Sequence, residues 1–156
     1  MNHYTNRQGM TLVETLLMAT IITVLAAFII PVINVAIRSR ENAECARKLR
    51  TAVLAFESYA AEIRSYPADT TPGVIPPEMA NYYFPYYKID WWGDPAELGG
   101  QWDWDNGYHF ALSVSIAEPT KPSAQMIEFD RLIDDGNLSS GNFRQVGTQY
   151  HYIIQQ

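Results

Sequence analysis

Residues 9–37 read GMTLVETLLMATIITVLAAFIIPVINVAI, and this stretch decides how the rest of the chain is organised. From Thr15 through Ile37 it holds 23 consecutive residues without a charged side chain. As a helix they would be roughly 34 Å long, against about 30 Å for the hydrocarbon core of a bilayer. The stretch is therefore predicted to span a membrane as a helix.

Glu14 stands at the edge of this apolar run. A carboxylate there is costly unless it is paired, so an ionisable residue in such a place is a functional hypothesis by default. The partner that we expect is an α-amino group. Such a group lies close to Glu14 only if the chain is cut just before Met10.

The residues around Glu14 form a recognisable layout: a short polar leader with Arg7, then Gly9, the apolar Met10, and Pro31 inside the apolar run. This layout resembles the class III signal of type IV pilins and of the pseudopilins of type II secretion systems. In that family a membrane aspartyl peptidase cuts after the glycine and methylates the new amino terminus. The resemblance implies cleavage between Gly9 and Met10, N-methylmethionine at Met10, and a role for Glu14 in assembly.

The cationic amine created at Met10 would lie one helical turn from Glu14, and in a staggered bundle it could reach Glu14 of a neighbouring subunit. A buried pair of this kind fixes register more than it adds stability. The alternative is that residues 10–37 form an ordinary signal anchor or a secretory signal peptide. A secretory signal has a shorter apolar core with its small-residue cut site after that core, whereas here the small residue comes first.

The chain has 156 residues, which leaves room for one small domain beyond the anchor. We expect a leader at 1–9, a transmembrane half of a spine helix at 10–37, an amphipathic half at 38–65 and a head at 66–156. The predicted fold class is α+β and pilin-like, with the long spine helix packed on a small antiparallel sheet.

Apolar residues recur at steps of three and four along 38–65, which predicts one buried helix face. They are Cys45, Leu49, Val53, Phe56, Ala60 and Ile63. Cys45 is the one cysteine, so no disulfide can form within the chain. Tyr66 and Pro67 are expected to end the helix.

In the head, apolar residues alternate with small or polar ones over 108–117, which predicts a strand. Its second face carries Ala and Ser and leaves space for close packing or for water. Two more strands are predicted at 143–146 and 150–154. A short helix is expected from Ser123, as its cap, through Asp134, with Gly136 as its stop.

Residues 68–100 hold a cluster of aromatic side chains without a sustained period, and we interpret them as the connection between helix and sheet. The cluster consists of Tyr82, Tyr83, Phe84, Tyr86, Tyr87, Trp91 and Trp92. Core packing is the favoured role, because this part of the chain offers few aliphatic residues. Stacking on sugar rings or contact with a partner is the alternative.

Two acidic segments raise the question of calcium. Residues 103–107 read DWDNG, but the EF-hand spacing fails because position seven is His109 and position twelve is Val114. Residues 134–137 read DDGN and could supply oxygen ligands from another direction. Turn chemistry accounts for both segments, so no cofactor is expected, and calcium in the head is the less favoured alternative.

The histidines are scattered: His3 lies in the leader, and His109 and His151 lie on predicted strands. They form neither a metal site nor a triad with a nucleophile, and no enzyme is predicted. Residues 66–156 carry twelve acidic against four basic side chains, a net charge of −8. This charge repels phosphate backbones, so nucleic-acid binding is not expected.

The predicted function is a pilin-like structural subunit of a type II secretion pseudopilus or a type IV pilus. The resemblance implies as partners a prepilin peptidase and methyltransferase, copies of the chain itself, other pilin-like subunits and an inner-membrane assembly platform. It implies a single-pass location in a bacterial inner membrane, with a cytoplasmic N-terminus and a periplasmic head, and later a periplasmic or surface filament. The alternative is a membrane-tethered module that binds carbohydrate or protein.

Overall fold

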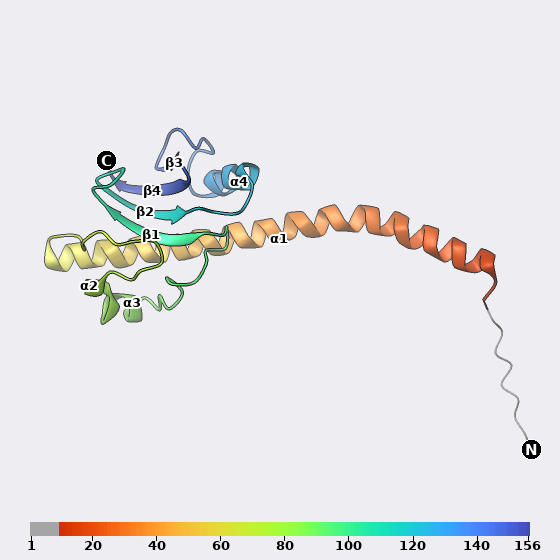
Figure 1. Ribbon diagram of the computed structural model, residues 1–156, viewed down its shortest axis with the longest axis horizontal. Coiled ribbons are helices and arrows are strands. Elements are labelled where there is room, and N and C mark those ends of the chain that lie inside the picture. Colours follow the sequence, from red (N-terminus) through yellow and green to blue (C-terminus); the bar gives the residue numbers. More distant parts are fainter. Residues whose placement is uncertain (1–9) are drawn as a thin grey trace, which may run out of the picture. The chain divides into compact units, whose positions relative to one another are not determined.

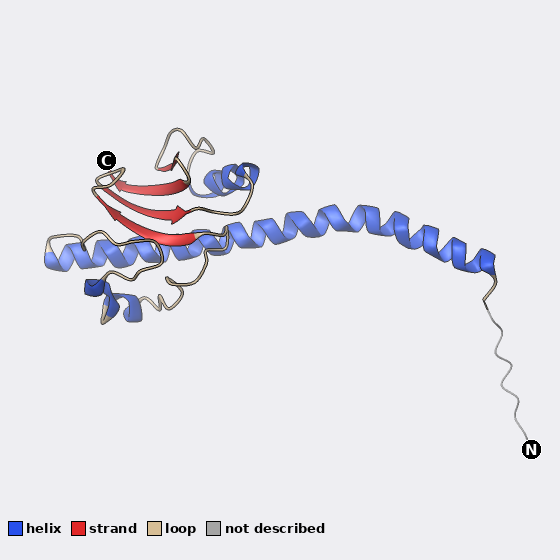
Figure 2. Cartoon of the chain, viewed as in Figure 1, coloured by secondary structure: helices blue, strands red, loops and turns tan. Residues whose placement is uncertain are grey.

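The computed structural model describes residues 10–156, so the expected leader and Gly9 lie outside the described residues. The described chain has an α+β layout with one long N-terminal helix and a small antiparallel sheet (Figures 1 and 2), as predicted at that level. It divides into two compact units, one ending at Ile37 and the other running from Arg38 to Gln156. The elements are α1 (Leu12–Ile63), α2 (Pro77–Ala80), α3 (Tyr83–Tyr86), β1 (Gln101–Asn106), β2 (Leu112–Ala117), α4 (Ser123–Ile133), β3 (Phe143–Val146) and β4 (Gln149–Gln155).

The C-terminal end of α1 is set by residues close to it in the sequence. Pro31 lies inside the helix and does not end it. The helix stops at Ile63 because Arg64 takes a left-handed backbone conformation, with φ of 62°, while its N–H still donates to the carbonyl of Ala60. Pro67, which follows within one turn, could not continue the helix.

In the second unit, one face of α1 is buried, as the periodicity predicts, by Cys45, Leu49 and Phe56. The prediction is wrong for Ile63, which is half exposed. The last turn uses another side of the helix: the ring of Tyr59 packs edge-on against Tyr83, and the Tyr83 hydroxyl donates to Glu62 at 2.7 Å.

The sheet has the strand order β1-β2-β4-β3, with every neighbouring pair antiparallel. Its inner face packs against α1, and the ring of Phe56 stacks on Trp104 with 3.9 Å between the ring centroids. Phe56 also packs edge-on against Phe84 of α3 and against Trp92 in the loop that follows α3. The Phe56 ring therefore connects α1 both to the sheet and to the segment that contains α3 and Trp92.

Two predicted head elements need correction. The strand expected over 108–117 begins only at Leu112, because Gly107 has φ of 85° and its N–H donates to the carbonyl of Ala111, which closes a turn. His109 therefore lies in a bend and not on a strand. Ser123 is the first residue of α4 and not its cap, which falls on Pro122 without a side-chain hydrogen bond. The strands predicted at 143–146 and 150–154 are confirmed.

Candidate functional site

The N-terminal end of α1 is organised by Thr11 and Glu14. The Thr11 N–H and the Thr11 hydroxyl donate to Glu14 Oε2 at 2.8 and 2.9 Å, and the Glu14 N–H approaches the Thr11 hydroxyl oxygen at 3.3 Å. This is a capping box, in which an N-cap side chain and the residue three positions on satisfy each other's free backbone donors. The sequence prediction did not include it, although the T-x-x-E spacing carries the signal. Glu14 Oε1 keeps its lone pairs for another partner.

The apolar side chains between Leu12 and Ile37 face outward all around the helix. By length and composition this part of α1 could cross a membrane. The threonine hydroxyls are turned back onto the helix: Thr20 donates to the carbonyl of Leu17 at 2.8 Å, and Thr23 to that of Thr20 at 2.9 Å. The surface of this segment is therefore suited to an apolar environment, whether lipid or other helices.

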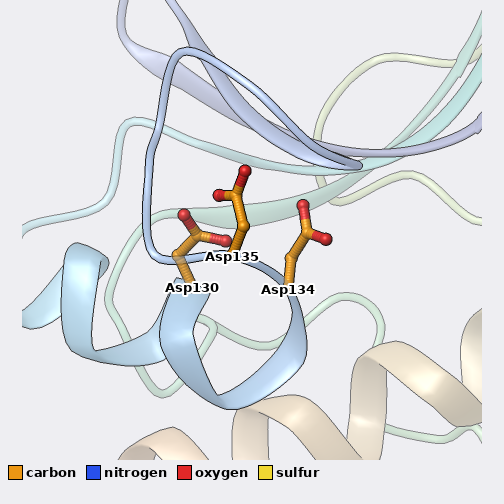
Figure 3. Close-up of side chains that lie close together, drawn as sticks. All are labelled: Asp130, Asp134 and Asp135. Atoms are coloured by element: carbon orange, nitrogen blue, oxygen red, sulfur yellow. The ribbon is translucent and has the colours of Figure 1, made fainter.

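A cluster of carboxylates lies where α4 ends (Figure 3). Asp130, Asp134 and Asp135 each offer an oxygen, and these oxygens lie within 4.8 Å of one another. Burial and the negative charges of Asp135 and Asp134 raise the pKa of Asp130 to about 6, and the backbone N–H groups of Gly136 and Asn137 limit this rise. Carboxylate oxygens are the kind of ligand that hard cations prefer. The sequence pointed to Asp134 and Asp135 but missed Asp130.

The other acidic segment with a calcium alternative, 103–107, does not join this group. Asp103 and Asp105 belong to β1, so they are strand residues and not turn residues as favoured from the sequence. They project to the outer face of the sheet, away from Trp102 and Trp104, which lie in the core. Calcium binding there stays an untested alternative.

The outer face of the sheet carries a buried polar cluster, made of Asp103, Asp105, Ser113, Ser115 and His151. Strand register places these residues together, because Asp103 pairs with Ser115, and Ser115 pairs with His151. All five are at most 3% exposed. The Ala and Ser face predicted for this strand is thus filled by acidic and imidazole side chains from its two neighbours.

Asp105, Ser113 and His151 have the residue types of a catalytic triad but not its geometry. His151 Nδ1 lies 3.2 Å from Asp105 Oδ2 and 3.1 Å from the Ser113 hydroxyl oxygen. A triad needs the serine and the carboxylate on opposite ring nitrogens, whereas both are on Nδ1 here. His151 Nε2 is buried without a hydrogen-bond partner in the described part of the chain. The arrangement does not support nucleophilic catalysis.

The two carboxylates of this cluster differ in protonation. Burial pushes the pKa of Asp105 upward, but hydrogen bonds from His151 and the neighbouring serines outweigh it and hold the pKa below its ordinary value. Burial, with the negative charges of Asp105 and Asp69, raises the pKa of Asp103 to about 7. The outer face therefore holds one charged and one partly protonated carboxyl group near neutral pH.

The aromatic cluster is mainly core, as favoured from the sequence. Tyr83, Phe84, Trp91 and Trp92 are buried, whereas Tyr82 and Tyr86 are 59% and 68% exposed. The two exposed rings stack on each other with 6.0 Å between their centroids. They are the side chains available for the alternative binding role.

The described sites thus fall into three groups: the capped start of α1, the carboxylates at the end of α4, and the polar cluster on the outer face of the sheet. Each is formed within one of the two compact units. Comparisons with models of known protein families, with curated proteins and with solved structures find no match for this chain.

Proposed function

We propose that the chain is a pilin-like structural subunit of a type II secretion pseudopilus or a type IV pilus. Before assembly it is cut between Gly9 and Met10 and methylated on the new amino group of Met10. The observation that carries the proposal is the order of features along α1. A charge-free apolar segment directly follows the Gly9–Glu14 layout, and the same helix then covers a small sheet.

Assembly in this proposal depends on moving α1 from lipid into a protein bundle. The apolar side chains of the first unit are exposed along the segment, so this surface can exchange lipid for neighbouring helices. Helices associate in such surroundings through packing and polar contacts, because the lipid tails are as apolar as the side chains. The head stays outside the bundle.

Glu14 sets the stagger of neighbouring subunits. In its own chain Thr11 engages only Oε2, so Oε1 can accept from the amine of Met10 in the next subunit. A carboxylate and an ammonium that meet in a low dielectric strongly disfavour any register that separates them. The pair selects one arrangement among many that apolar helices would otherwise permit.

The partners and the location follow from this role. A membrane peptidase and methyltransferase processes the precursor in a bacterial inner membrane, with the leader on the cytoplasmic side and the head in the periplasm. An inner-membrane assembly platform then adds subunits to a periplasmic or surface filament. The acidic head, with its net charge of −8, is unsuited to nucleic acid.

The deciding experiment is the intact mass and N-terminal sequence of the protein isolated from its native membrane. We expect a chain that begins at Met10 and carries one additional methyl group. The control is a Gly9→Val variant, which should keep residues 1–9 because the cut site is blocked. A wild-type chain that still begins at Met1, in cells with an active prepilin peptidase, would overturn the proposal.

The second candidate is a membrane-tethered module that binds carbohydrate or protein, which the exposed ring pair of Tyr82 and Tyr86 favours. Glu14→Ala separates the two candidates. A fibre subunit with this change should still be cut but should fail to enter filaments, whereas a tethered binder should keep its binding unchanged. Filament content in membrane and extracellular fractions measures the difference.

A further inference from the structure

The loop that follows α4 contains an acceptor pattern for N-linked glycosylation. Asn137, Leu138 and Ser139 fit N-x-[ST], with a residue other than proline in the middle. The chain has eight asparagines, and no other is followed two positions later by serine or threonine. Because the pattern is short, its meaning depends on whether the folded chain presents the Asn137 amide to a large enzyme.

The loop turns the two reactive positions of the pattern outward. Asn137 and Ser139 are exposed, whereas Leu138 between them is partly buried and packs against the hydrophobic core. The Leu138 carbonyl accepts from the Gln145 N–H at 2.9 Å, which holds the middle residue against β3. The acceptor amide and the hydroxyl therefore lie on the outer side of an anchored loop.

The side chain of Asn137 has its oxygen engaged and its nitrogen available. Asn137 Oδ1 accepts from the Ser139 N–H at 3.2 Å, which forms an Asx turn. Among residues 10–156, neither Asn137 Nδ2 nor the Ser139 hydroxyl takes part in a hydrogen bond. Nδ2 is the atom that receives the sugar in N-linked glycosylation, so no existing contact has to break before it reacts.

A charged carboxylate stands two residues before the acceptor. Asp135 is exposed and accepts from the Ser140 hydroxyl at 2.7 Å and from the Asn137 N–H at 2.8 Å. The hydrogen bond from Ser140, followed by that from Asn137, lowers the pKa of this carboxyl group, so it is ionised at neutral pH. It gives a basic side chain of an enzyme a fixed point of attachment beside the acceptor.

We propose that Asn137 carries an N-linked oligosaccharide, transferred from a polyprenyl pyrophosphate carrier by a membrane oligosaccharyltransferase. Asn137 Nδ2 forms a bond to the anomeric carbon of the first sugar while the bond from that carbon to the pyrophosphate oxygen breaks. Nδ2 loses one proton to a base of the enzyme, and the polyprenyl pyrophosphate leaves with the electron pair. The step needs no oxidant or reductant.

The inference rests on the proposed function at one point, which is that the head lies on the periplasmic side of the membrane, where we place the transfer. It adds a property that the filament role does not require. An oligosaccharide is bulky and hydrated. Residues 137–139 must therefore face solvent in an assembled filament and cannot belong to a contact between subunits.

The test is mass spectrometry of the protein isolated from its native membrane and digested with trypsin. Cleavage after Arg131 and Arg144 releases residues 132–144 as one peptide, which contains Asn137 and Asn142. We expect this peptide to carry the mass of an oligosaccharide, with fragment ions that keep the first sugar on Asn137. An unmodified peptide in all of the protein, or a sugar on any other residue of the peptide, would overturn the proposal.

Variants produced in the same cells test the recognition of the pattern. Asn137→Gln and Ser139→Ala should each lose the modification, whereas Ser139→Thr should keep it because threonine supplies the same hydroxyl group. Asn142→Gln is the matched control in the same peptide and should be modified like the wild type. Modification of Ser139→Ala at the wild-type level would contradict the assignment.

The same sample separates this inference from the proposed function, because it also reports the N-terminus. A chain that begins at methylated Met10 but has a bare Asn137 would overturn the glycosylation alone. A chain that still begins at Met1 and carries the sugar would overturn the filament role alone.

Discussion

At the scale of single residues, Asp103 links the stability of the head to pH. Its folded pKa of about 7 lies above its ordinary value of 3.8. Between these values the folded chain keeps a proton that the unfolded chain has lost, so stability falls as pH rises through this window. The slope from one such group is at most about 1.4 kcal/mol per pH unit.

We predict that Asp103→Asn makes the free energy of unfolding less dependent on pH between about 4 and 7. An amide of nearly the same shape carries no titrating proton, so this contribution disappears. Urea unfolding of the full chain in detergent measures it through tryptophan fluorescence, because all four tryptophans lie between Trp91 and Trp104. An unchanged pH profile in the variant would show that the slope comes from other groups.

His151 is predicted to be a structural residue. His151→Ala should lower the free energy of unfolding by roughly 3 kcal/mol, because it leaves the buried Asp105 carboxylate without its imidazole partner. His109→Ala is the matched control: that histidine is exposed, and its removal should change stability by no more than about 0.5 kcal/mol. Equal small effects of the two substitutions would contradict the prediction.

At the scale of elements, the start of α1 gives Glu14 two separable roles. Glutamine can replace glutamate in a capping box, since its amide oxygen also accepts from the free N–H groups. Glu14→Gln should therefore preserve the helix start but remove the charge that the Met10 amine requires. We predict normal cleavage and helicity with impaired filament assembly, measured by circular dichroism in detergent and by filament yield.

Glu14→Ala removes both roles and supplies the comparison. Loss of the capping interaction should cost about 1 kcal/mol and fray the first turn of α1. If Glu14→Gln assembles as the wild type does and only Glu14→Ala fails, the cap rather than the charge matters for assembly.

The elements that the sequence predicted well are those with one clear period. α4 and β3 each bury one side, and the amphipathic half of α1 does the same, whereas β4 was predicted although it buries residues on both faces. The strand β1 was not predicted, although Trp102 and Trp104 alternate with Asp103 and Asp105. The aspartates suggested a turn, because acidic side chains are rare in buried strands. Burial of these aspartates depends on Ser113 from β2, which pairs with β1, and on His151 from β4, which lies beyond β2. Contacts between strands so far apart in the sequence cannot be predicted from the local pattern.

The candidate sites show the same difference between features that are local in sequence and features that depend on distant contacts. Glu14 could be identified because its place relative to Gly9 is local in sequence. Asp134 and Asp135 were visible as neighbours, and Asp130 is one helical turn before Asp134. What the sequence could not show is that the Asp130 side chain is buried, because its surroundings include the backbone of Gly136 and Asn137 in the loop after α4.

At the scale of the whole molecule, the hydrophobic core that the described residues form lies within the second unit, from Cys45 to Tyr150. We predict that a chain of residues 38–156 folds without detergent, because it loses no core contact. Dispersed amide signals in nuclear magnetic resonance, and a cooperative urea transition matching that of the full chain, would support this. A broad, non-cooperative transition would show that the first 37 residues contribute to the fold.

Cys45 is the single thiol of the chain, and it is fully buried in α1 against the head. Burial, followed by the negative charge of Glu97, raises the pKa of this thiol well above its ordinary value, so it hardly reacts while the head is closed. A thiol reagent can therefore modify it only in molecules that have opened transiently. The labelling rate therefore reports how often the head opens. The wild-type chain can be measured in this way without an introduced cysteine, both free in a membrane and packed among other subunits.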